Sequence, residues 1–305
     1  MADKGKNFFS KMDTVLSIDI DGVDLNDRKK VEEINSLVEQ KVKVYVEKLK
    51  SSHTKFIDED FGPEEGDEHG AKSLYGTAMP APAGSKYPRP EDLRWDRPIY
   101  DDNYFSSETG GEGDGEEDDE GEEEEADEFE DDFGGASLFE DAGEDDIWCK
   151  HGSLFLDGTS SGDVIQGQLG DCRFLGALAV MGAHESLLHQ CFWKADSFKN
   201  YGLFVVRFFK DCEVIFVIID DRLPVKQRDG KIIFAACKDP NELWVPLLEK
   251  AYAKLHGCYK ALIGGYSHNA LSDMTGFSPK LVVLKPGFTG YSESLDKEEV
   301  CGMAK

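Results

Sequence analysis

Residues 166–177 read Gln-Gly-Gln-Leu-Gly-Asp-Cys-Arg-Phe-Leu-Gly-Ala, and this stretch decides how the rest of the chain is interpreted. Gly167 and Gly170 give the backbone unusual conformational freedom just before an apolar, helix-like run. Asp171 is a residue type favoured at helix N-caps, so we expect a helix to begin at Cys172. The positive end of a helix dipole lowers the pKa of a thiol placed there and favours the thiolate, which is the form that attacks carbonyl groups.

Gln166 lies six residues before Cys172, where the loop could fold its side-chain amide back beside the sulfur. An amide at that place can donate a hydrogen bond to the oxyanion that develops during attack on a carbonyl group. The plainer interpretation is that Cys172 is an inert core residue, as cysteines beside apolar helices usually are. The combination of the Gln spacing with the Gly-Asp-Cys turn favours a nucleophile.

This stretch resembles the nucleophile segment of calpains, a family of papain-like cysteine peptidases with the pattern Q-G-x-L-G-D-C-W-F-L-A-A. Further calpain-like motifs follow in the family's order, and they lie at residues 156–158, 220–224, 241–255 and 261–265. Several motifs in the right order are far more specific than one. The resemblance implies an α+β fold of the papain-like calpain first subdomain, in which a central helix carries Cys172 and small β-strands surround it.

The composition and the calpain resemblance together divide the chain into six expected parts. Residues 1–25 have no assignment, 26–52 form an amphipathic helix, 53–107 an extended calpain-like lead-in, 108–146 an acidic low-complexity segment, 147–276 the calpain-type catalytic subdomain 1, and 277–305 a truncated tail. Apolar residues three and four apart predict the helix, which packs either on the chain's own globular part or on a partner. Within 147–276 we expect a short helix at 185–193, a helix at 241–256, and strands at 201–209, 213–219 and 231–235.

The acidic segment 108–146 holds 22 of the 62 acidic residues and no Lys or Arg. Its low-complexity part, residues 108–132, cannot bury apolar surface and repels itself, so we expect a disordered, solvated insertion there. Weak calcium buffering or contact with a basic partner is the alternative role. Nucleic acid is excluded as an expected partner, because phosphate binding needs a basic surface.

Seven scattered cysteines, without any C-x-x-C pair, favour a reducing compartment over a disulfide framework or structural zinc. The opening residues lack the apolar run of a secretory signal. The longest apolar run, 214–219, is far too short to span a membrane. We therefore expect a cytoplasmic protein without a membrane span.

A papain-like site also needs a His and an Asn, which calpains carry in later G-H-A-Y and N-P-W motifs; the sequence has neither motif. Arg173 stands where the family has Trp, so a cation on a flexible stem replaces a large apolar ring. Two hypotheses remain. The chain is the Cys-bearing part of a calcium-dependent endopeptidase that performs limited proteolysis of proteins. Alternatively, it is a catalytically inactive calpain homologue that acts as a calcium- or protein-binding regulatory module.

The resemblance also implies a calcium site and a substrate-binding loop. The matching calcium ligands are the backbone carbonyls of Leu156 and Gly158 and the carboxylates of Asp163 and Glu242. Oxygen ligands of this kind suit Ca²⁺. The plainer alternatives are that Asp163 only caps a turn and that Glu242 only favours a helix start. The matching glycines for protein or peptide substrate lie at 264–265, where a simple turn is the alternative.

Overall fold

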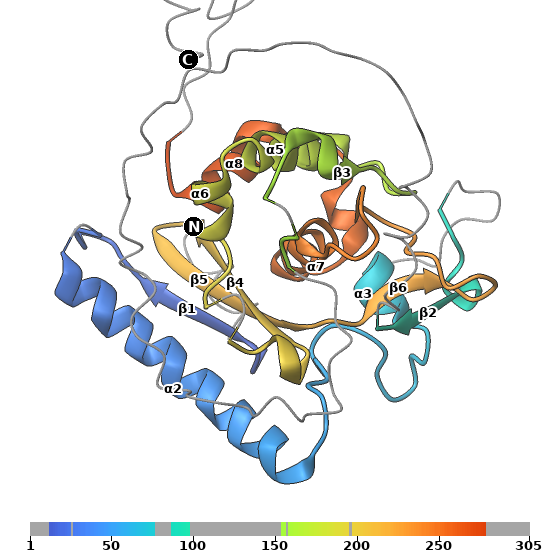
Figure 1. Ribbon diagram of the computed structural model, residues 1–305, viewed down its shortest axis with the longest axis horizontal. Helices are drawn as coiled ribbons and strands as arrows, with labels where there is room; N and C mark the ends of the chain where they lie inside the picture. The colour runs from blue at the N-terminus through green and yellow to red at the C-terminus, as the bar shows by residue number, and fades with distance from the viewer. Residues whose placement is uncertain are drawn as a thin grey trace, which may run out of the picture.

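The computed structural model describes residues 12–25, 27–76, 87–97, 154–156, 158–194 and 197–278. The predicted acidic segment 108–146 lies outside the described residues, and so does the predicted tail from residue 279 onward. The described residues form a mixed α and β structure in which helices cover both faces of a small antiparallel sheet (Figure 1).

The sheet is built on a hairpin of β4 (Leu203–Lys210) and β5 (Glu213–Asp220), which confirms two of the predicted strands. Asp211 and Cys212 make the turn, with positive φ values of 53° and 63°. A third strand, β1 (Val15–Asp19), pairs with the other edge of β5, so the strand order is β1-β5-β4. A segment nearly two hundred residues earlier in the chain thus completes the sheet.

Alternate side chains of β5 enter two different cores, because successive residues of a strand point to opposite faces. Ile215, Val217 and Ile219 join the larger core, and the residues between them join the smaller one. Both faces of the strand are therefore covered, which explains why β5 reads as one continuous apolar run.

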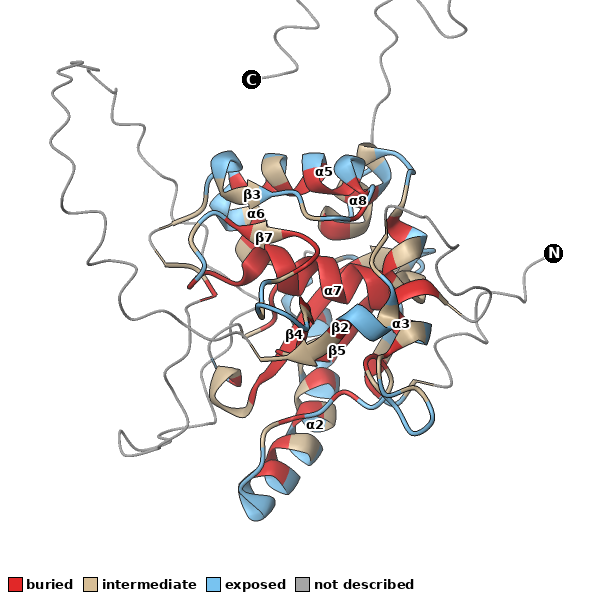
Figure 2. Cartoon of the chain, turned by 90° about the vertical axis from the view of Figure 1, so that its right-hand side faces the viewer, coloured by how far each residue is buried: buried red, intermediate tan, exposed pale blue. Residues whose placement is uncertain are grey.

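The smaller core is covered by α2 (Arg28–Ser52), which lies along one face of the sheet (Figure 2). Asp27 caps this helix by accepting a hydrogen bond from the backbone N–H of Lys29 at 3.0 Å. Its buried residues recur three and four apart: Val31, Ile34, Val38, Val42, Val46 and Leu49. The chain's own sheet therefore covers the apolar stripe of this helix.

The larger core lies on the other face and contains α5 (Cys172–Gly182), α6 (Glu185–His189), α7 (Trp244–His256) and α8 (Ser267–Thr275). Twelve of the residues of α7 are buried, and Gly257 ends it with a φ of 96°, as predicted. Because α7 is enclosed between the sheet and the layer of α5 and α8, it is the most deeply buried helix in the described part of the chain (Figure 2). The predicted Cys172 helix is present as α5, but α7 is the more deeply buried of the two.

Short elements complete the unit. The lead-in contributes α3 (Ala71–Tyr75), the 3-10 turn η1 (Pro90–Asp92) and β2 (Leu93–Asp96), which pairs with β6 (Leu223–Lys226). A second short pair joins β3 (Val164–Ile165) to β7 (Ala236–Cys237). Further 3-10 turns are η2 (Ser161–Asp163), η3 (Lys199–Tyr201) and η4 (Tyr259–Leu262).

The predicted strand at 231–235 is wrong. Ile232 makes a single bridge to Val225, and the N–H of Ile233 donates to the carbonyl of Pro224 at 3.1 Å, but the pairing with β6 goes no further. The carbonyl of Ile233 accepts from Gln168, and the N–H of Ala235 donates to the Glu249 carboxyl group. These backbone groups hold the nucleophile loop and α7 instead of extending a strand ladder.

Two fully buried lysines of α7 tie the early and late parts of the chain together. Lys250 Nζ donates to the carboxylate of Asp220 and to its backbone carbonyl at 2.9 Å. Lys254 Nζ donates to Asp58 Oδ2 at 2.6 Å, to Thr14 and to the carbonyl of Ile218. Segment 12–97 therefore supplies acceptors for a cation in the middle of the core, as a buried charge requires.

Candidate functional site

The thiol of Cys172 is exposed at the first residue of α5. The helix starts here because the carbonyl of Asp171 accepts from the N–H groups of Phe174 and Leu175, at 2.7 and 3.1 Å. The side chain of Asp171 makes no cap hydrogen bond, which corrects the prediction that it caps the helix. Instead it turns inward and is 1% exposed. Cys172 thus faces solvent over the positive end of the helix dipole.

Gln166 lies in the loop before the helix, and its amide Nε2 donates to the carbonyl of Leu169 at 3.0 Å. The amide is therefore held within its own loop, and its predicted position beside the Cys172 sulfur stays a prediction. Two backbone hydrogen bonds pin the loop to later parts of the chain. Gln168 donates to Ile233 at 2.9 Å, and Gly170 accepts from Gly264 at 3.4 Å.

Gly167 is required by a close approach of two backbones. A β-carbon at this position would overlap the carbonyl group of Phe234.

Gly167→Ala is therefore expected to lower the free energy of unfolding by about 1–3 kcal/mol, because neither backbone can move aside easily. Denaturant titration measures the loss. Gly176→Ala is the matched control: its nearest neighbour would be Ser267 Oγ at 3.8 Å, so this change is expected to stabilise α5 by about 0.5–1 kcal/mol. Equal stabilities of the two variants would contradict the close approach.

Arg173 joins the Cys172 helix to the predicted substrate glycines. Its guanidinium donates to the carbonyl of Gly265 and lies over the ring of Tyr266, 5.4 Å from the centroid. Gly264 and Gly265 have positive φ values of 86° and 83°, and a β-carbon on either would meet open space. The structure therefore brings 264–265 beside the start of α5 and leaves their backbone open to solvent.

A cavity of about 320 Å³ opens behind this loop, between α5, α7, η4 and α8. Asp273 lies in its wall, where it accepts from Tyr252 at 2.8 Å and Lys210 at 3.3 Å. Burial alone would raise the pKa of Asp273, but hydrogen bonding to His256 and the charge of Lys210 hold it below its usual value.

The histidines that follow Cys172 make contacts of their own. His189 stacks on Phe155 with ring centroids 4.1 Å apart, His256 lies 3.8 Å from Asp273, and His268 stacks on Tyr266. In the part of the chain that the structure describes, no histidine ring is hydrogen-bonded to the Cys172 thiol.

Both predicted calcium carboxylates lie near one buried thiol, that of Cys237. Pairing of β3 with β7 sets Val164 opposite Cys237, and the carbonyl of Asp163 accepts from Lys238 at 2.8 Å. Burial raises the pKa of the Cys237 thiol, and the charges of Glu242 and Asp163 raise it further. Both carboxylates are therefore close to the same sulfur.

The structure supports the plainer interpretation for Asp163, a turn cap, but not the one for Glu242, a residue of the first helical turn. Asp163 does cap a turn, because it accepts from the N–H of Ser160 at 2.6 Å. Glu242 precedes the N-cap residue of α7, Leu243, so it does not lie in the first helical turn. Its side chain is only 4% exposed. Carboxylate oxygens are ligands that a calcium ion uses, so both residues keep the donor type that the predicted site needs.

Leu156 and Gly158 precede η2 and are half-buried. Gly158 has a φ of 96° and faces the carboxylate of Glu185. Among the described residues, no three His, Cys, Asp or Glu side chains group as metal ligands, so a site here would depend on backbone carbonyls. No described helix has the length and apolar character needed to cross a membrane.

Sequence reasoning missed the partner of Asp171, which is Glu249 on α7. The sequence did contain a sign of this partner, because three charged residues, Glu249, Lys250 and Lys254, interrupt the otherwise apolar run of α7. A charged residue on a buried face needs a partner of its own.

Comparison with known proteins agrees with the geometry of this site. The family described as calpain family cysteine protease matches residues 144–298. Calpain-5 of Caenorhabditis elegans is 43% identical over 144 residues, which cover 43% of this chain and 22% of that protein. The human calpain-1 catalytic subunit is 42% identical over 125 residues, covering 40% and 17%, respectively. The maize calpain-type cysteine protease DEK1 is 44% identical over 123 residues, covering 40% and 6%. The match thus spans less than a quarter of each relative, and the chain belongs to the calpain family of cysteine proteases.

Proposed function

We propose that this chain carries the nucleophile part of a calpain-type cysteine endopeptidase site that acts on proteins. The observation that carries the proposal is the exposed Cys172 thiol at the first residue of α5, beside the open backbone of 264–265. In this reading the Cys172 thiolate attacks the scissile carbonyl carbon, and Gln166 donates to the resulting oxyanion after leaving the Leu169 carbonyl. Gly264 and Gly265 lie where a substrate strand would approach.

The histidine and asparagine of the site are not supplied by any described residue in contact with Cys172. Protonation of the leaving amine then depends on a group outside the described contacts. This favours the second candidate function for the chain by itself, an inactive calpain homologue that binds calcium or a protein. The hydrogen bond from Arg173 to the carbonyl of Gly265 also favours the inactive homologue, because this bond occupies a carbonyl group on the open loop. A cytoplasmic location, and a basic partner for the segment 108–146, stay predictions.

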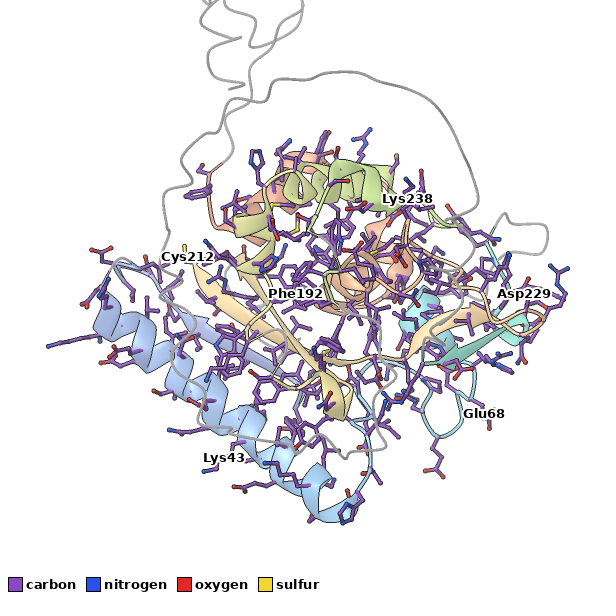
Figure 3. The ribbon with its side chains drawn as sticks, viewed as in Figure 1. Lys43, Glu68, Phe192, Cys212, Asp229 and Lys238 are labelled. Carbon is purple, nitrogen blue, oxygen red and sulfur yellow. The ribbon has the colours of Figure 1, made fainter. Side chains whose placement is uncertain are left out.

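The reactivity of Cys172 can be compared with that of another exposed thiol in the same chain. Cys212 lies in the β4–β5 turn, away from α5, between Asp211 and Glu213 (Figure 3). Iodoacetamide is expected to label Cys172 faster than Cys212, because the helix start and the adjacent cation of Arg173 increase the reactivity of a thiol, whereas two acidic residues flank Cys212. Cys191 is expected to label slowest, because burial raises its pKa to about 12.

Mass spectrometry of the labelled peptides across pH ranks these thiols. A Cys172 that labels no faster than Cys212 would refute its role as nucleophile. Arg173→Gln separates the two causes: the variant should lose the part of the rate advantage that comes from the guanidinium and keep the part that comes from the helix start.

We also propose that calcium binds between the carbonyls of Leu156 and Gly158 and the carboxylates of Asp163 and Glu242. Asp163→Asn is the sharpest variant, since the amide oxygen can still accept from Ser160 while the charge is lost. Calorimetric titration of the chain with Ca²⁺ is expected to lose its tightest one-to-one phase in this variant, because the ion loses half of the carboxylate charge of the site.

Asp211→Asn is the matched control, because Asp211 is a turn residue with a φ of 53°, which Asn adopts well. This control should bind calcium as the wild type does. Binding that is unchanged in Asp163→Asn would reject the site and assign calcium to the segment 108–146 instead.

A further inference from the structure

Two carboxyl groups meet in the core directly beneath Cys172. Asp171 precedes the cysteine, Glu249 comes from the middle of α7, and each is 1% exposed. The two carboxyl groups lie close enough for each to act directly on the protonation of the other. Glu249 Oε2 accepts from the N–H of Ala235 at 3.0 Å. Both Asp171 oxygens and Glu249 Oε1 are buried and meet no N–H or O–H donor among the described residues.

Two ionised carboxylates cannot form a hydrogen bond with each other, because each can only accept. At this depth they would also repel strongly. Burial, and then the neighbouring Asp171, raise the pKa of Glu249 well above its usual value, and burial raises the pKa of Asp171. A proton on one of the four oxygens supplies the missing donor and removes the repulsion.

The surroundings supply no counter-charge to the pair. The groups that act on Glu249 are its burial, Asp171 and the Ala235 N–H, and none of them is a cation. Lys250, the next residue of α7, points to Asp220. Tyr259 of η4 faces the pair, and its burial, together with Glu249, Asp220 and Asp171, keeps the phenol neutral. Two other buried carboxylates, Asp58 and Asp220, each have a lysine partner.

We infer that Asp171 and Glu249 share a single proton, and that the resulting hydrogen bond between an acid and a carboxylate is a positioning element for Cys172. This hydrogen bond takes the place of a side-chain cap on α5, because it connects Asp171, the residue before Cys172, to Glu249 on α7. It also limits the negative charge beneath the thiol to one, and a second charge there would disfavour the thiolate. The positioning role depends on the proposed role of Cys172, whereas the shared proton does not.

Glu249→Gln is the decisive variant, because an amide can accept from Ala235 and donate to the Asp171 carboxylate at once. This change keeps both hydrogen bonds and the single negative charge. Glu249→Leu removes the partner and leaves Asp171 without a donor. Iodoacetamide labelling of Cys172 is expected to keep the wild-type pH profile in Glu249→Gln and to lose it in Glu249→Leu.

The proton itself is measured by the pH dependence of unfolding. A carboxyl whose pKa is raised by folding stabilises the fold fully below its unfolded pKa of about 4.3 and loses that contribution as pH rises toward the folded value. Between these two pKa values, each rise of one pH unit should increase the unfolding equilibrium constant of the wild type about tenfold more than it increases that of Glu249→Gln. An infrared difference spectrum between the two proteins should show the carbonyl band of a protonated carboxylic acid in the wild type alone.

The results of these experiments distinguish the shared proton of Asp171 and Glu249 from the proposed nucleophile role of Cys172. Equal pH slopes in wild type and Glu249→Gln, or a Cys172 profile that moves to lower pH in Glu249→Gln, would mean that both carboxyls are ionised and would overturn the inference. A slope present only in the wild type, with Cys172 labelling slowly in every variant, would support the shared proton and refute the nucleophile proposal alone. Asp171→Asn, which can also donate to Glu249, provides a second variant should Glu249→Gln fail to fold.

Discussion

Asp220→Ala is expected to lower the free energy of unfolding by about 3–5 kcal/mol, which is the usual effect of removing one partner from a buried ion pair. Asp220 is fully buried and accepts from Lys250, from Arg222 Nε at 2.6 Å and from the backbone of Asp58 at 2.9 Å. Its loss leaves the Lys250 ammonium without a counter-ion in the core. Urea titration measures the change.

The exposed pair of Glu64 and Lys72, 3.0 Å apart, provides the control. Glu64→Ala is expected to change stability by at most about 1 kcal/mol, because exposed ion pairs are screened by solvent. Equal losses in the two variants would mean that Asp220 and Lys250 gain no stability from their burial together.

The same pair predicts a pH dependence of opposite sign to that of Glu249. Burial alone would raise the pKa of Asp220, but Lys250 and Arg222 lower it below its usual value. A group with a lowered folded pKa stabilises the protein above its unfolded pKa of about 3.9 and loses that contribution as pH falls through the folded value. Two buried carboxyl groups of one core, one paired with a lysine and one with an acid, thus respond to pH in opposite directions.

Local signals in the sequence were enough to predict the elements that carry the nucleophile. The Gly-Asp turn predicted a helix start at Cys172, and α5 begins there. Runs of β-branched and aromatic residues predicted strands at 201–209 and 213–219, which are β4 and β5. Gly257 marked the end of α7, although the helix begins at Trp244 and not at residue 241. Each of these features is decided by residues that are close in the chain.

Pairings over long distances could not be read from the sequence. Asp58 and Lys254 are separated by 196 positions, and neither residue carries a mark of its partner. Residues 231–235 were predicted to form a strand because their side chains are mostly apolar. However, the carbonyl of Ile233 accepts from Gln168, and the N–H of Ala235 donates to the Glu249 carboxyl group. Asp171 looked like a helix cap, and burial turned it into the partner of a second acid.

An activated ester and a peptide amide are expected to behave very differently toward this chain. A nitrophenyl ester of a short peptide should release close to one equivalent of nitrophenolate rapidly, because the Cys172 sulfur can form a thioester while the departing phenolate needs no proton. A peptide amide needs a proton on its leaving nitrogen, and general acid–base help of this kind is commonly worth about 10²–10⁴-fold. Amide hydrolysis should therefore be slower by at least that factor than in a calpain assayed alongside. Stopped-flow absorbance follows the ester, and a fluorogenic peptide with calcium follows the amide.

Two variants show which thiol is responsible. Cys172→Ala should abolish the burst, whereas Cys212→Ala, which removes a second exposed thiol of the described residues at a helix-free turn, should leave it unchanged. A burst that survives Cys172→Ala would refute the nucleophile. If the chain instead turns over the peptide amide, and Cys172→Ala stops it, the inactive reading fails, because some residue of this chain then protonates the leaving amine. His268 would be the first to replace, since its ring stacks on Tyr266, the residue that Arg173 joins to the start of α5.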